Sequence, residues 1–154
     1  MKWLRVLHLI LVSIWFGATV CIGFLSIICF YHLSTAEFLI VGPLIPELYQ
    51  KIVLPVAVLT ILQGIIYGSS TKWGFFKYPW VMLKWILTFL LIPCLSLETI
   101  GQLFSVLDVI NTAGFSASLQ MGGRILLCIA LQISILLVMI GVSVLKPGKL
   151  RTIG

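Results

Sequence analysis

Two ionisable side chains, His8 and Lys84, occur within long apolar runs of this sequence. Gln63 occurs within a third run, so three separate segments each carry one polar side chain in apolar surroundings. An ionisable group at membrane depth is costly to maintain and is therefore a candidate for function. An imidazole is also a common metal ligand, which makes His8 the candidate metal-binding residue.

The spacing of nearby residues adds neighbours to these candidates. Trp15 follows His8 by about two helical turns and therefore shares its face of a helix. Thr60 and Tyr67 share a helical face with Gln63 in the same way. We therefore expect each of these helices to present its polar candidate together with an aromatic or hydroxyl side chain.

Each candidate also has an ordinary structural explanation. Lys84 could extend its ammonium group to the lipid headgroups, as lysines near helix ends do. His8 could hydrogen-bond a backbone carbonyl near the membrane interface, and Gln63 could simply join two helices. His32 is expected at the opposite headgroup level, because about 36 Å of helix separates it from His8 at about 1.5 Å per residue. The two histidines therefore cannot bind one metal within a single helix.

The composition shows which elements must position these residues. Hydrophobic residues make up 61% of the 154-residue chain and charged residues 9%, and the mean hydropathy is +1.22. Soluble domains carry about 25% charged residues, so the sequence predicts an all-α integral membrane protein. A spanning helix needs about 20 apolar residues, and runs of about this length predict one four-transmembrane-helix bundle over 1–154. The expected spans are 4–31, 51–68, 79–97 and 125–145.

The charges between these spans and at their ends predict the orientation. With four spans, one side of the membrane receives most of the cationic residues: Lys2, Arg5, Lys72, Lys77, Lys146, Lys149 and Arg151. The other side receives all four acidic residues, Glu37, Glu47, Glu98 and Asp108. Only two cations, Lys51 and Arg124, lie on that side. The positive-inside rule then places both termini in the cytoplasm of a multi-pass inner (plasma) membrane protein.

This orientation also predicts partners and depth. Acidic lipid headgroups attract cations at the cytoplasmic surface, so membrane lipid is the expected partner and nucleic acid is not. Gly64 and Gly68 form a small-residue pair that favours close helix packing, either within the bundle or in a homo-oligomer. His8, Gln63 and Lys84 are expected in one layer, about 5–10 Å below the inner surface at about 1.5 Å per residue.

The opposite half of the membrane receives the cysteines in this topology: Cys21, Cys29, Cys94 and Cys128. Thiolates suit copper(I), whereas buried cysteine commonly acts as a small apolar side chain. The long connection 98–124 is expected either to carry an interfacial helix or to extend the third span. Its small-residue part, 113–123, is expected to be irregular.

Four short motifs carry a resemblance to a known family. They are "LHLILVSIWFGATV" at 7–20 with "FYH" at 30–32, "LQGIIYG" at 62–68, "WVMLK" at 80–84 and "SVLKPGK" at 143–149. Together they resemble the bacterial membrane protoporphyrinogen oxidase family and the related copper resistance D-like membrane proteins. The resemblance implies a four-helix membrane fold, with His8 matching a histidine associated with haem and Lys84 matching a functionally important lysine.

If this resemblance holds, the expected ligand is haem b or another porphyrin in a cytoplasmic-side pocket. Haem b needs an axial ligand, an apolar slot and cations for its propionates. His8 would supply the ligand, Trp15 part of the slot, and Arg5 or Lys84 the propionate partner, with Gln63 beside them. Met82 is one candidate for a second axial ligand, and five-coordination or a ligand from a second copy is another.

Three functions therefore remain open at the level of sequence. The first is a haem- or porphyrin-binding membrane protein, which would make a redox role as a membrane oxidoreductase conceivable. The second is a small transporter or copper-handling protein, in which Lys84 and Gln63 face the bundle interior and the cysteines act as soft ligands. The third is a non-catalytic assembly protein, whose polar layer only joins helices.

Overall fold

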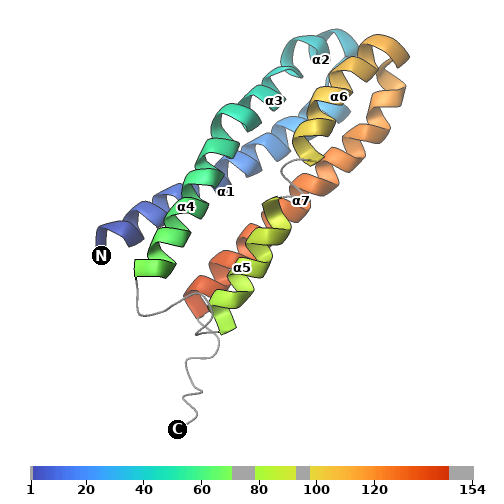
Figure 1. Ribbon diagram of the computed structural model, residues 1–154. Coiled ribbons are helices and arrows are strands. Elements are labelled where there is room, and N and C mark those ends of the chain that lie inside the picture. Colours follow the sequence, from blue (N-terminus) through green and yellow to red (C-terminus); the bar gives the residue numbers. More distant parts are fainter. Residues whose placement is uncertain (1, 71–78, 93–97, 146–154) are drawn as a thin grey trace.

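The computed structural model describes residues 2–70, 79–92 and 98–145, which are helical apart from short turns and contain no strand. The helices follow one another along the chain as α1 Lys2–Tyr31, α2 Thr35–Val41, α3 Leu44–Leu48, a π-helical turn Tyr49–Val53, α4 Leu54–Ser70, α5 Pro79–Leu91, α6 Glu98–Ala113 and α7 Phe115–Leu145. In Figure 1, α1 leads from the N-terminus to α2, α3 and α4 return alongside it, and α5 and α6 lie along α7.

Three helical stretches are long and apolar enough to cross a membrane: Trp3–Tyr31, Thr35–Ser69 and Ser118–Leu145. A fourth apolar helix, α5, has 13 residues, which is about 20 Å at about 1.5 Å per residue. This length falls short of the hydrocarbon core of about 30 Å. The expected span 79–97 is described only as far as 92, and the next described helix, α6, begins at Glu98.

Local hydrogen bonds define the start of the second span and a π-helical turn within it. Ser34 caps α2 with a capping box, in which the Glu37 carboxylate accepts the Ser34 backbone N–H at 2.8 Å. Further along, the π-helical turn ends with the Leu54 N–H donating to the Tyr49 carbonyl. Pro55 follows directly and has no N–H of its own, so the ordinary helical bond is absent there.

The expectation of an irregular segment at 113–123 was wrong. Only Gly114 interrupts the helices there, with φ of 86°, a left-handed conformation that glycine adopts without strain. Helix α7 therefore begins at Phe115, well before the expected start at 125. The small residues serve helix packing, because a Cβ at Gly122 would lie 2.7 Å from the ring of Phe30 on α1.

A buried polar network ties three elements together away from the chain termini. Tyr49 donates its hydroxyl hydrogen to Gln132 Oε1 at 2.9 Å, and Gln132 Nε2 donates to Thr99 Oγ1 at 3.1 Å. All three side chains are fully buried. Interhelical hydrogen bonds of this kind join membrane helices, so the network fixes the π-helical turn and α6 against α7.

Candidate functional site

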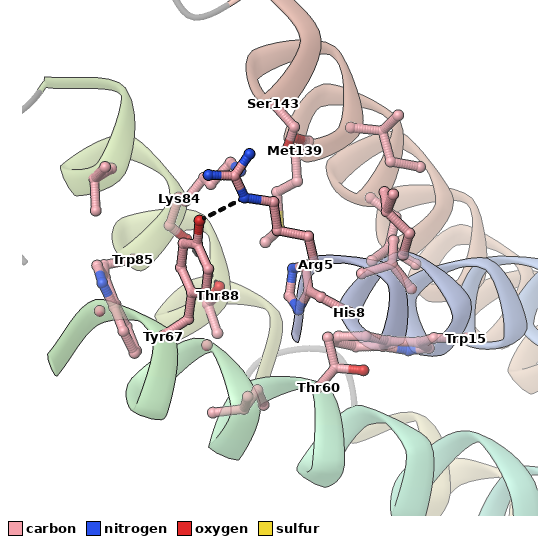
Figure 2. Close-up of a pocket in the computed structure, with 18 of the residues that line it drawn as sticks. Arg5, His8, Trp15, Thr60, Tyr67, Lys84, Trp85, Thr88, Met139 and Ser143 are labelled. Carbon is pink, nitrogen blue, oxygen red and sulfur yellow. Dashed lines mark hydrogen bonds between the residues drawn. The ribbon is translucent and has the colours of Figure 1, made fainter. Parts of the chain in front are cut away.

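A partly open cavity of about 460 Å³ lies beside the N-terminal half of α1 (Figure 2). Four helices contribute its walls: α1, α4, α5 and α7. The lining residues are Arg5, His8, Leu9, Val12, Trp15, Thr60, Ile61, Gly64, Tyr67, Gly68, Trp80, Val81, Lys84, Trp85, Thr88, Leu136, Met139, Ile140 and Ser143. The cavity therefore combines apolar and aromatic walls with a few polar side chains, as ligand sites commonly do.

Four of the five candidate cofactor-binding residues line this one cavity. Arg5, His8 and Trp15 reach it from a single face of α1, and Lys84 reaches it from α5. The helical spacing of His8 and Trp15 explains their shared face. In Figure 2 the Trp15 side chain lies at one end of the cavity, and Arg5, Tyr67 and Lys84 lie toward the other.

The fifth candidate, Gln63, does not line the cavity. Its side chain is buried, and Nε2 donates a hydrogen bond of 2.6 Å to the backbone carbonyl of Leu4. Its neighbours on α4, Thr60 and Tyr67, do line the cavity. Gln63 is therefore turned toward α1, where it joins two helices.

Cationic groups dominate the polar part of the cavity. Arg5 Nε donates to the hydroxyl oxygen of Tyr67 at 3.0 Å, which links α1 to α4 (Figure 2). Lys84 Nζ lies 5.3 Å from the centre of the Trp80 ring, within the range of a cation–π interaction. None of the described residues that line the cavity is acidic. The lining therefore favours an anionic ligand over a cationic one.

The imidazole of His8 has an unusual environment. Its Nδ1 atom is buried and has no hydrogen-bond partner among the described residues. Leaving a buried polar atom unpaired costs about 1–3 kcal/mol, and native structures contain few such atoms. His32, in contrast, is exposed and lies just beyond the end of α1, far from the cavity.

Helix α7 contributes lining residues that the sequence did not single out. Met139 and Ser143 lie on the cavity wall, whereas Met82 is 42% exposed and lies outside the lining. The thioether nearest to a cavity ligand is therefore that of Met139. Helix α7 reaches the cavity because it pairs antiparallel with α1, through contacts such as Gly122 with Phe30. Without that pairing, the sequence does not indicate that Met139 and Ser143 line the cavity.

Two glycines on α4 leave space in the cavity. Gly64 and Gly68 both line it, and a Cβ at Gly64 would meet no atom within 4 Å. Gly64 therefore does not support close helix contact within the chain, and the alternative of contact in a homo-oligomer stays a prediction. Close approach occurs instead at Gly23, where a Cβ would lie 3.0 Å from Ile129, and at Gly122.

The cysteines do not form a cluster of metal ligands in the described residues. Cys21 is exposed, Cys29 is buried, Cys128 is partly buried, and each is a free thiol. Across the same described ranges, no three histidine, cysteine, aspartate or glutamate side chains gather around one point. Cys94 lies outside the described residues.

Comparison of the chain with protein-family models, curated proteins and solved structures finds no match. The cavity and its residues are therefore the basis for a functional proposal.

Proposed function

We propose that the chain is a four-span membrane protein with both termini in the cytoplasm. Packing on α7 supports the fourth crossing, because α5 and α6 both lie against that one long helix (Figure 1). The two short helices in succession would cover the length that α5 alone does not. The cavity would then lie on the cytoplasmic side of the inner (plasma) membrane, at the end rich in cations.

We propose further that this cavity binds haem b or a related porphyrin. The observation that carries the proposal is the meeting, in one cavity, of His8, the Trp15 ring, Arg5 and Lys84 without an acidic neighbour in the lining. A volume of about 460 Å³ falls within the range of about 300–1,000 Å³ typical of ligand pockets. The donor set also fits, because haem needs an imidazole or thioether ligand, apolar walls and propionate partners.

Each lining residue has a defined role in this proposal. His8 would supply an imidazole to the iron through Nε2, because Nδ1 is buried, and Met139 would be the thioether of the lining in place of Met82. Arg5 and Lys84 neutralise the propionates, while Trp15 and the aliphatic side chains around it exclude water. A bound haem would supply one-electron redox chemistry, which makes a membrane oxidoreductase the corresponding activity.

A haem titration of the purified protein in mild detergent tests the proposal. We expect saturable binding by the wild-type chain and a loss of affinity of more than about tenfold in His8→Ala, since even outer partners of a metal ligand contribute that much. His32→Ala is the matched control and should bind as the wild type does. Unsaturable uptake by the wild type, or equal affinity in His8→Ala, would contradict the proposal.

One observation favours a second candidate, a non-catalytic assembly protein. The hydrogen bond from Gln63 to the Leu4 carbonyl shows that one member of the expected polar layer joins helices. If His8 and Lys84 acted in the same way, their substitution would lower stability or self-association without affecting a bound ligand. Loss of bound haem from a His8→Ala protein that remains folded would rule this candidate out.

A further inference from the structure

The cavity is least closed between α4 and α5. Helix α1 packs against both α4 and α7, and α5 packs against α7. Helices α4 and α5 both line the cavity, yet between Leu54–Ser70 and Pro79–Leu91 the structure shows no close packing of the pair. In a bilayer, this side of the cavity faces lipid. A ligand can therefore enter from the membrane without crossing the bundle.

The depth of the cavity matches one leaflet. Arg5 and Trp15 lie at its two ends on the same helix, about 15 Å apart along the axis at about 1.5 Å per residue (Figure 2). This distance is half of the hydrocarbon thickness of about 30 Å. Between them the wall includes aliphatic side chains, Leu9 and Val12 from α1 and Ile140 from α7, next to His8 and the hydroxyl groups of Thr60 and Thr88. A single acyl chain is the kind of group that such a wall accommodates.

The charge at the Arg5 end selects the headgroup. Arg5 and Lys84 both belong to the lining, and Tyr67 adds a hydroxyl group beside Arg5. The acidic residues of the chain lie in helices α2, α3 and α6, which occupy the opposite end of the molecule (Figure 1). Cations near a membrane surface attract acidic lipids, with a preference of about fivefold for each cation.

From these observations we infer that the cavity is a binding site for an acidic phospholipid, with the phosphate at Arg5 and an acyl chain running toward Trp15. The lipid enters between α4 and α5. This site does not depend on haem. Where the haem proposal also holds, the two ligands share Arg5 and exclude each other, so acidic lipid raises the haem concentration needed for binding.

Tryptophan quenching by lipids with brominated chains tests this inference in haem-free protein whose other tryptophans, Trp3, Trp73, Trp80 and Trp85, are replaced by phenylalanine, so that Trp15 alone is observed. Trp15 is 3% exposed and lines the cavity, so a chain inside the cavity quenches a residue that bulk lipid does not reach. The protein is reconstituted into bilayers of neutral lipid. A small fraction of brominated lipid, either acidic or neutral, is then included in these bilayers. We expect at least about fivefold stronger apparent binding of the acidic lipid, the preference provided by one cation near the surface.

Two variants and two matched controls locate the site. Arg5→Gln removes a cation from the cavity, and Arg124→Gln removes an exposed cation outside it. Gly64→Leu fills the cavity at unchanged charge, and Gly101→Leu adds the same side chain at an exposed glycine whose Cβ would meet no atom within 4 Å. We expect Arg5→Gln to lower the preference for acidic lipid by about fivefold, since Lys84 remains in the lining. Gly64→Leu should abolish the preference, and both controls should retain it.

Three results would overturn the inference. They are equal quenching by acidic and neutral lipid, an unchanged preference in Arg5→Gln, and an unchanged preference in Gly64→Leu, which would place the lipid on the outer surface. Helical circular dichroism and a single size-exclusion peak establish that each variant is folded before it is compared. Because no haem is present, the result stands apart from the haem titration.

Discussion

Buried polar atoms fall into two groups in this molecule, those with partners and those without. Gln132 uses both ends of its amide, accepting from Tyr49 and donating to Thr99. In contrast, His8 Nδ1 has no partner among the described residues. Satisfied buried groups hold a structure together, whereas an unsatisfied one costs free energy and is uncommon in native structures.

The satisfied network provides a prediction at the residue scale. Tyr49→Phe removes the hydroxyl donor and leaves Gln132 Oε1 without that hydrogen bond in a fully buried position. We expect the free energy of unfolding to fall by about 1 kcal/mol, near the value of interhelical hydrogen bonds in membranes. Unfolding in mixed detergent micelles measures the change.

Tyr31→Phe is the matched control, because Tyr31 is 65% exposed at the end of α1. Its unfolding free energy should stay close to that of the wild type. Equal losses in the two variants would show that the hydroxyl of Tyr49 contributes nothing specific.

Residue spacing predicted part of the candidate site. The seven-residue step from His8 to Trp15 placed both on one helical face, and both line the cavity. The same reasoning grouped Gln63 with Thr60 and Tyr67. A helical face is wide enough that Thr60 and Tyr67 line the cavity while Gln63 does not. Gln63 turns toward Leu4 because α1 lies beside that edge of α4. Periodicity identifies a face of one helix, and the neighbouring helix decides which edge of that face meets the cavity.

At the scale of elements, the contact between α1 and α7 organises the bundle. Gly122 and Gly23 let these long helices approach closely along their length. Read as sequence, the small residues of 113–123 resemble a loop, because glycine and serine are common in both loops and membrane helix interfaces. Only the position of the partner helix distinguishes the two, which explains why this segment was wrongly expected to be irregular.

Adjacent glycines on α7 allow a matched test of this contact. Gly122→Ala would place a Cβ 2.7 Å from a ring carbon of Phe30, whereas Gly123 is exposed and a Cβ there would meet nothing within 4 Å. We expect Gly122→Ala to lower the free energy of unfolding by about 1–3 kcal/mol, the usual cost of overpacking. Gly123→Ala should change it by less than about 0.5 kcal/mol.

The same micelle unfolding assay compares the two variants. A loss in Gly123→Ala as large as that in Gly122→Ala would contradict the packing of α1 on α7.

At the scale of the whole molecule, charge is separated along the bundle. The cations of the cavity lie near the N-terminal end of α1, and the acidic residues lie in α2, α3 and α6 at the other end. Composition and apolar run length predicted the helical, membrane-type architecture, because both follow from burial of side chains in lipid. The long connection 98–124 was expected either to carry an interfacial helix or to extend the third span, and it contains helix α6 and the start of α7. Apolar run length alone did not predict these boundaries, since it does not show where a helix begins.

The charge separation predicts how the molecule sits in the membrane. A reporter that fluoresces only in the cytoplasm should be active when fused after the last residue. A reporter that is active only outside the cytoplasm should work when inserted at Gly114, between α6 and α7. Cells carrying each fusion are compared at matched expression. The reverse pattern of activity would contradict the proposed four-span arrangement, because a three-span chain with a cytoplasmic N-terminus gives that pattern. Activity of the same reporter at both positions would contradict the crossing by α7.

The most direct test of the haem proposal is an absorption spectrum of the protein purified in mild detergent from cells supplied with a haem precursor. The spectrum is recorded after oxidation in air and again after reduction with dithionite. The proposal predicts a Soret band that sharpens on reduction in the wild type and is lost in His8→Ala. A well-expressed, folded wild-type protein with no such band would contradict it, and the polar residues of the cavity would then serve lipid binding or helix association.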